Sequence, residues 1–176
     1  MAYNSLEELK RKEGGFAYEV LGTGTPTWNI VNDDRGNYFT LLTLVGGNIA
    51  PGVEDVVRQT ADNLGANLYT FGAASEINRR DAQRLRITPT GYDDKPLADL
   101  LSRSIGISLT DHNGSEVLQL SGRNRSLVQD LQNGLGRGPV SIRRTGSANN
   151  TAHPVNRYIS AGGVEIAIRR DVLQLD

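Results

Sequence analysis

Cysteine is absent from this 176-residue sequence, which excludes a disulfide scaffold, a thiolate metal site and a cysteine nucleophile. Histidine is almost as scarce, since His112 and His153 are the only two. No apolar run approaches the roughly 20 residues of a membrane span, and the first residues lack the basic and apolar regions of a signal peptide. We therefore expect neither a membrane span nor a cleaved secretion signal.

Lysine is also rare, with 3 residues against 16 arginines. Arginine is favoured at protein interfaces and on phosphates because its planar guanidinium makes paired hydrogen bonds. A GC-rich genome would give the same bias. The net charge is only -1, which argues against a globally basic nucleic-acid binder. The length suits one domain with one core.

Glycine is abundant, at 20 of 176 residues against an average of about 7%, and this predicts many turns between short strands. The apolar, β-rich run of residues 38–45 is the best candidate for a central strand. Pro51 is expected to start a helix, because apolar residues from Val53 to Leu64 follow a 3.6-residue period and Gly65 ends it. Asn124 is expected to cap a later helix that carries Leu127, Val128 and Leu131.

Two hairpins are predicted from short turns between apolar runs. The first joins residues 105–109 to residues 117–120 through the Asn-Gly turn of 111–114. The second joins residues 155–160 to 164–170 through Ala-Gly-Gly. These hairpins favour an α+β fold: a single domain over residues 1–176, with a mostly antiparallel sheet and about four short helices. An extended N-terminal arm (1–15) and a long polar loop (145–157) are expected to flank it.

Basic residues gather in the C-terminal third, where residues 117–170 hold eight arginines against two acids, a net charge of +6. This segment is expected to face solvent, a protein partner or, as a secondary alternative, nucleic acid. Its only aromatic residue is Tyr158, which argues against recognition of single strands by stacking. The candidate interface or phosphate-contacting residues are Arg123, Arg125, Arg137, Arg143, Arg144 and Arg157.

His153 is the one residue that raises the alternative of a small hydrolase. No acid lies between Asp130 and His153, and the next acid along the chain is Glu165. A general base gains its efficiency from such positioning, so we predict that His153 is not catalytic. We expect no catalytic residue, no cofactor and no metal, and we expect the protein not to be an enzyme.

Residues Leu118–Asp130 resemble a strand, Gly-Arg turn and short-helix pattern of contractile-tail baseplate hub proteins of phages. The absence of cysteine, the glycine-rich strands and the arginine-heavy surface are similar to small virion proteins of tailed phages. This resemblance implies a structural subunit of a tail, neck or baseplate, located in the virion and made in the host cytoplasm. Its partners would be copies of itself and other virion proteins. The alternatives are a capsid decoration protein, a nonspecific nucleic-acid-contacting protein and a small hydrolase.

Overall fold

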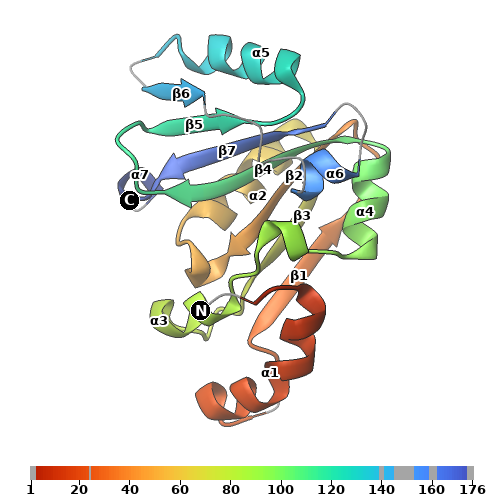
Figure 1. Ribbon diagram of the computed structural model, residues 1–176, viewed down its shortest axis with the longest axis vertical. Coiled ribbons are helices and arrows are strands. Elements are labelled where there is room, and N and C mark those ends of the chain that lie inside the picture. The colour runs from red at the N-terminus through yellow and green to blue at the C-terminus, as the bar shows by residue number, and fades with distance from the viewer. Residues whose placement is uncertain (1–2, 24, 139–140, 145–152, 159–161, 174–176) are drawn as a thin grey trace.

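A seven-stranded sheet in the order β1-β3-β2-β4-β7-β5-β6 forms the centre of the computed structural model (Figure 1). The structure describes residues 3–23, 25–138, 141–144, 153–158 and 162–173. Of the six strand pairings, β2 with β3, β2 with β4, β4 with β7 and β5 with β6 are parallel. The pairings of β1 with β3 and of β5 with β7 are antiparallel.

The strands are β1 (Trp28–Asp33), β2 (Phe39–Gly46), β3 (Asn67–Ala73), β4 (Ile105–His112), β5 (Leu118–Ser121), β6 (Ile142–Arg144) and β7 (Val164–Arg169). The α-helices are α1 (Leu6–Leu21), α2 (Val53–Leu64), α3 (Arg79–Ala82), α4 (Lys95–Ser102), α5 (Arg125–Leu135), α6 (Pro154–Arg157) and α7 (Arg170–Leu173). Short 3-10 turns are η1 (Gly47–Ile49), η2 (Gln83–Leu85) and η3 (Pro89–Gly91).

The central strands are buried on both faces, so the sheet separates two apolar cores. Leu42 and Tyr69 pack with residues of α1 and α4 on one face. Leu41 and Leu68 pack against Val53, Val57 and Ala61 of α2 on the other. Successive side chains of a strand point to opposite faces, so neighbouring leucines of β2 enter different cores. A third, smaller cluster lies under α5.

The prediction of a mostly antiparallel sheet with about four short helices is wrong. The sheet is mixed, parallel pairings are in the majority, and the described residues form α1 to α7, so the fold is of the α/β kind. The predicted elements at β2, α2 and α5 are confirmed, and Asn124 accepts a hydrogen bond from the backbone of Leu127 as a cap.

Both predicted hairpins are wrong, and the reason is the position of β7. This C-terminal strand lies between β4 and β5 and pairs with each, so the Asn-Gly turn joins strands that are not neighbours. The second predicted hairpin fails because Pro154–Arg157 is helix α6. A turn sequence reports a local change of direction, whereas the choice of neighbouring strand depends on packing over the whole sheet.

The segments expected to flank the domain have different outcomes. Most of the expected arm, from Leu6 onward, belongs to α1, where Leu6 and Leu9 are buried in the core. Of the expected polar loop, residues 145–152 lie outside the described residues. Across the described part of the chain, no helix is long and apolar enough to cross a bilayer.

Candidate functional site

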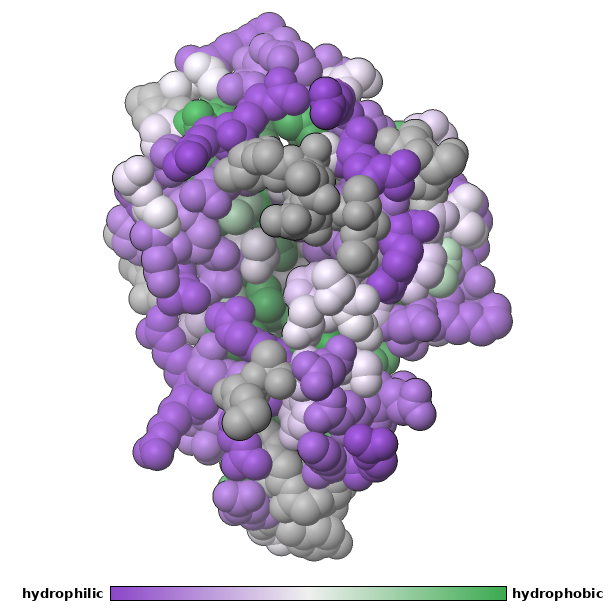
Figure 2. Space-filling view, viewed as in Figure 1, coloured by the Kyte–Doolittle hydropathy of each residue, from purple (hydrophilic) through white to green (hydrophobic). Residues whose placement is uncertain are grey.

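The carboxyl ends of β2, β4 and β7 meet at one edge of the sheet, because these three strands run parallel. Open α/β sheets bind ligands outside the carboxyl ends of their strands, where connecting loops diverge. Two cavities lie at this part of the sheet, and Arg86 lines both. Figure 2 shows a hollow near the middle of the view with apolar surface at its base and hydrophilic residues to its left.

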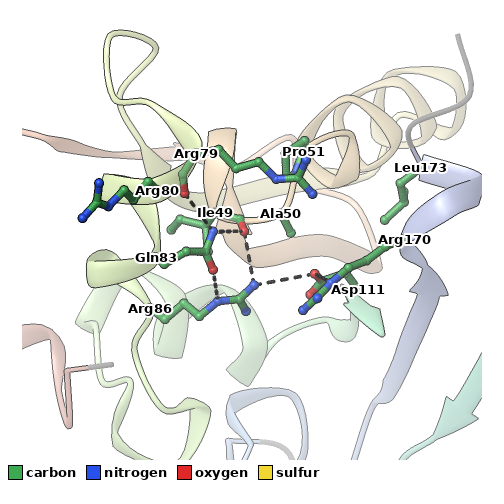
Figure 3. Close-up of a pocket in the computed structure, with 10 residues that line it drawn as sticks. All are labelled: Ile49, Ala50, Pro51, Arg79, Arg80, Gln83, Arg86, Asp111, Arg170 and Leu173. Carbon is green, nitrogen blue, oxygen red and sulfur yellow. Dashed lines mark hydrogen bonds and ion pairs between the residues drawn. The ribbon is translucent and has the colours of Figure 1, made fainter. Parts of the chain in front are cut away.

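The first cavity, which we call the arginine pocket, has a volume of about 390 Å³. Residues 49–51 after β2, residues of α3 and η2, and the ends of β4 and β7 surround it. Figure 3 shows the side chains that line it: Ile49, Ala50, Pro51, Arg79, Arg80, Gln83, Arg86, Asp111, Arg170 and Leu173. Four arginines and a single carboxylate give the lining a net charge of +3, so it favours an anionic ligand.

Asp111 holds two of these arginines in place. Its carboxylate accepts a hydrogen bond from Arg170 Nε at 2.6 Å and lies 3.6 Å from Arg86 Nη2. Gln83 accepts from Arg86 Nε at 2.8 Å, and the Ile49 carbonyl accepts from Arg86 Nη2 at 3.2 Å (Figure 3). These bonds fix the guanidinium of Arg86 and leave N–H groups of both arginines for a ligand, since each guanidinium has five.

Arg79 and Arg80 are exposed at the start of α3, where Asn78 caps the helix by accepting from the backbone N–H of Asp81. Neither guanidinium has a hydrogen-bond or ion-pair partner among the described residues. In Figure 3 the side chain of Arg79 extends over Ala50 and Pro51, while that of Arg80 extends away from the centre of the pocket. The pocket therefore has fixed arginines at one side and free arginines at its rim.

The second cavity, which we call the strand-face cavity, has a volume of about 360 Å³ and is more apolar. Val45 at the end of β2 and Leu109 of β4 form part of its wall. Ser108 and Thr110 contribute hydroxyl groups, and Glu165 and His153 contribute the ionisable groups besides Arg86. The cavity lining is Leu44, Val45, Arg86, Ile87, Thr88, Pro89, Ser108, Leu109, Thr110, His153 and Glu165.

His153 and Glu165 are neighbours in this cavity, with His153 Nε2 3.9 Å from Glu165 Oε1. His153 Nδ1 accepts a hydrogen bond from the backbone N–H of Val155, so the ring proton lies on Nε2 and faces Glu165. Burial lowers the pKa of His153 to about 4 and raises the pKa of Glu165 to about 7. Glu165 can thus gain or lose a proton near neutral pH, as a general acid or base must.

The six arginines predicted from the C-terminal third do not form this site, and none of them lines either cavity. Arg123 and Arg157 bind backbone carbonyl groups, of Asn156 and of Thr90 and Tyr92 respectively. Arg143 pairs with Glu116 in the connection before β5, and Arg144 donates to Gln129 of α5. Arg125 and Arg137 are exposed near the two ends of α5.

Sequence reasoning missed the arginine pocket although a signal was present. Four arginines fall within residues 79–86: Arg79, Arg80, Arg84 and Arg86. That cluster is denser than any in the C-terminal third, but the sequence does not show that residues 79–86 meet Asp111 and Arg170 in space. Glu165 was missed because eleven residues separate it from His153, and β7 and α6 bring them together only in the folded chain.

No group of three His, Cys, Asp or Glu side chains is placed to hold a metal ion in the part of the chain that the structure describes. Among these described residues, His153 and Glu165 form a pair without a third such group, and the carboxylate of Asp111 is bound to Arg86 and Arg170.

Comparison with known proteins gives a consistent result. A family model described as "Poly-gamma-glutamate hydrolase" matches residues 3–173. The chain is 28% identical over 101 residues to the SPbeta prophage-derived UPF0714 protein YoqZ of Bacillus subtilis (strain 168), a match that covers 57% of this chain and 31% of the relative. The chain thus covers about a third of the length of this curated relative.

Two solved structures share the fold. One is described as "Structure of Bacteriophage poly-gamma-glutamate hydrolase": its TM-score is 0.79 at 19% identity, over 95% of this chain and 78% of that chain. The other is described as "YNDL-apo (Zinc-free)", with a TM-score of 0.75 at 16% identity, over 98% of this chain and 81% of that chain.

These matches overturn the prediction of a non-enzymatic virion subunit, whether of a tail, neck, baseplate or capsid. The resemblance at Leu118–Asp130 covers β5, a turn and the start of α5, a local unit that many folds contain, whereas the family match covers nearly the whole chain. The family is one of enzymes, so the expectation of no enzymatic role is wrong, and the alternative of a small hydrolase fits best. Self-association, nucleic-acid contact and virion location stay predictions.

Proposed function

This chain belongs to the poly-gamma-glutamate hydrolase family, and from that premise we propose that it binds poly-gamma-glutamate in the arginine pocket and hydrolyses its γ-amide bonds. Each residue of this polymer carries a free α-carboxylate, so the polymer is a chain of closely spaced negative charges. The observation that carries the proposal is the set of four arginines around one carboxylate at the carboxyl ends of β2, β4 and β7. Guanidinium groups bind carboxylates through paired, charge-assisted hydrogen bonds.

Arg86 joins the binding and reacting parts of the proposed site. A carboxylate held in the arginine pocket brings an adjacent amide towards the strand-face cavity, because Arg86 lines both. Glu165 is the group in that cavity suited to remove a proton from water, since burial raises its pKa to about 7. The water oxygen bonds to the amide carbon, the C–N bond breaks, and Glu165 passes the proton to the leaving amine.

Binding is tested first, with a γ-linked glutamate oligomer and the purified chain in calorimetry. The variant Arg79→Gln/Arg80→Gln should weaken binding about tenfold, because each charge-assisted bond is worth roughly 1.5–3 kcal/mol when formed and less at an exposed rim. The matched control is Arg143→Gln/Arg144→Gln, which removes the same charge from an adjacent exposed pair in β6. Equal losses in both variants would show that only net charge matters and would contradict a specific pocket.

Hydrolysis is tested by the release of new amino groups and by the shortening of the polymer on size-exclusion chromatography. Glu165→Gln should abolish turnover and keep oligomer binding, because it removes the base and preserves the shape of the side chain. Wild-type protein that binds the oligomer but releases no amine would contradict the hydrolytic half of the proposal and leave the binding half standing.

A further inference from the structure

The description of one structural neighbour contains the words "Zinc-free", so the question arises whether this chain has the residues of a zinc site. Catalytic zinc sites use three protein ligands drawn mainly from His, Cys, Asp and Glu. This sequence has no Cys and two His, and the described residues bring no three such groups together. His112 is committed elsewhere, since its Nδ1 accepts from the Gly114 N–H at 2.8 Å in the turn after β4.

Among the residues that the structure describes, the strand-face cavity offers two ligands, His153 and Glu165, which make an incomplete set. Asp111 would be the next acid, but its buried carboxylate already pairs with two guanidinium groups. The other walls near the ends of β2 and β4 are Val45, Ala50 and Leu109, whose side chains cannot bind a metal. The residues present therefore do not fit zinc.

Positive charge is nevertheless concentrated at the same edge of the sheet. The side chains of Arg86 and Arg170 are held there by Asp111, and the guanidinium groups of Arg79 and Arg80 stand at the rim. Beyond Nε, the guanidinium of Arg170 has no further hydrogen bond or ion pair among the described residues. A partly enclosed cluster of this kind attracts carboxylates without any bound cation.

We infer that this chain binds carboxylate ligands without zinc, with Arg86 and Arg170 supplying the fixed positive charge at the strand ends. The choice of carboxylates as ligands rests on the proposed function. The statement that no zinc takes part rests only on which His, Cys, Asp and Glu side chains are present. Arg170 acts by direct contact with the ligand, and Asp111 acts by orienting Arg170. The affinity should fall as salt rises, because exposed charge pairs are screened.

The first test measures metal content. The full chain, purified and dialysed, is analysed by elemental mass spectrometry, and its thermal midpoint is compared in zinc chloride and in EDTA. We expect substoichiometric zinc and the same midpoint in both solutions, because a ligand that binds the folded state raises the midpoint. One tightly held zinc per chain, lost in His153→Gln and kept in His112→Gln, would overturn the inference.

The second test uses glutarate as a small dicarboxylate probe, titrated with and without EDTA. We expect the same affinity in both solutions, about tenfold weaker binding in Arg170→Gln, and little change in the neighbouring Arg169→Gln. Arg169 is a matched control because it pairs with Asp171 outside the pocket. Circular dichroism checks that both variants fold.

The outcomes separate this inference from the proposed function. Glutarate binding that is insensitive to EDTA, without polymer binding, would contradict the proposed substrate and support the inference. Glutarate binding that requires added zinc, or that is absent at low salt, would overturn the inference whatever the polymer does.

Discussion

Asp111 at the end of β4 and Arg170 at the start of α7 are 59 positions apart in the sequence, yet Arg170 Nε donates to Asp111 Oδ2 at 2.6 Å. The carboxylate side chain is only 5% exposed, while that of Arg170 is 42% exposed. Because Asp111 also faces Arg86, it links three elements around the arginine pocket. This one carboxylate positions two of the four arginines that line the pocket and lowers the net charge of the lining to +3.

Asp111→Asn should destabilise the fold and strengthen anion binding. The amide keeps the size of the side chain and an acceptor oxygen that can still orient Arg170, but it loses the negative charge that competes with an anionic ligand for Arg86 and Arg170. We expect a loss of about 1–2 kcal/mol in the free energy of unfolding, below the value for a fully buried pair because both arginines are partly exposed. Urea denaturation and glutarate titration measure the two effects. Asp171→Asn is the control, since it breaks an exposed pair with Arg169 and should change neither quantity appreciably.

Glu165→Gln should remove the loss of unfolding free energy that ionisation of Glu165 causes as pH rises. Burial raises the pKa of Glu165 from 4.5 to about 7, so its stabilising contribution is complete below pH 4.5 and is lost as pH rises through 7. Relative to wild type, the variant should therefore gain about 2–3 kcal/mol in the free energy of unfolding between pH 5 and pH 8. The exposed Glu19→Gln should follow wild type at both pH values. A constant difference between Glu165→Gln and wild type would contradict the prediction.

His153 changes the pH dependence of the free energy of unfolding in the opposite direction to Glu165. Burial lowers its pKa from 6.5 to about 4, so its contribution is complete above pH 6.5 and is lost as pH falls through 4. In the wild type, protonation of Glu165 stabilises the fold as pH falls and offsets the loss from His153. Glu165→Gln removes this offset, so its free energy of unfolding should fall from pH 6.5 to pH 4. In Glu165→Gln/His153→Gln that fall should shrink, and denaturation at three pH values between 4 and 7 checks it.

Tyr69→Phe should cost more stability than Tyr92→Phe. The Tyr69 hydroxyl donates to Asp94 Oδ2 at 2.5 Å and lies 2.6 Å from the Tyr92 hydroxyl, which donates to it. Loss of the Tyr69 hydroxyl leaves the buried Tyr92 group without its acceptor, and we expect a cost of about 1–3 kcal/mol. Tyr92→Phe removes one bond and keeps the bond to Asp94. Equal costs in denaturant titrations would argue against this direction of donation.

Gly72→Ala and Gly134→Ala should change stability in opposite directions. A methyl group at Gly72 in β3 would meet the backbone of Gly46 in the paired strand β2, with the carbonyl carbon 2.5 Å away. We expect that close contact to cost about 1–3 kcal/mol, because backbone must move. Gly134 lies in α5 with open space around it, so alanine there should stabilise by about 0.5–1 kcal/mol. Thermal midpoints of the two variants test the contrast.

Elements that depend only on neighbouring residues follow directly from the sequence. The apolar period from Val53 to Leu64 and the glycine after it specify α2, and Asn124 specifies the start of α5. The β-rich run at residues 38–45 specifies the central strand β2. Helix hydrogen bonds join residues four apart, and a cap reaches three residues on, so the information lies within one short window.

Which strands are neighbours, and therefore where the site lies, depends on the folding of the whole chain. The insertion of β7 between β4 and β5 replaces an expected hairpin by a parallel pair with β4 and an antiparallel pair with β5, and it brings Glu165 to His153 and Arg170 to Asp111. No local pattern encodes this choice, because alternative sheet orders use the same strands and turns. They differ in how well both faces of the sheet are buried and in the chain entropy of closing long loops, which depend on the whole chain.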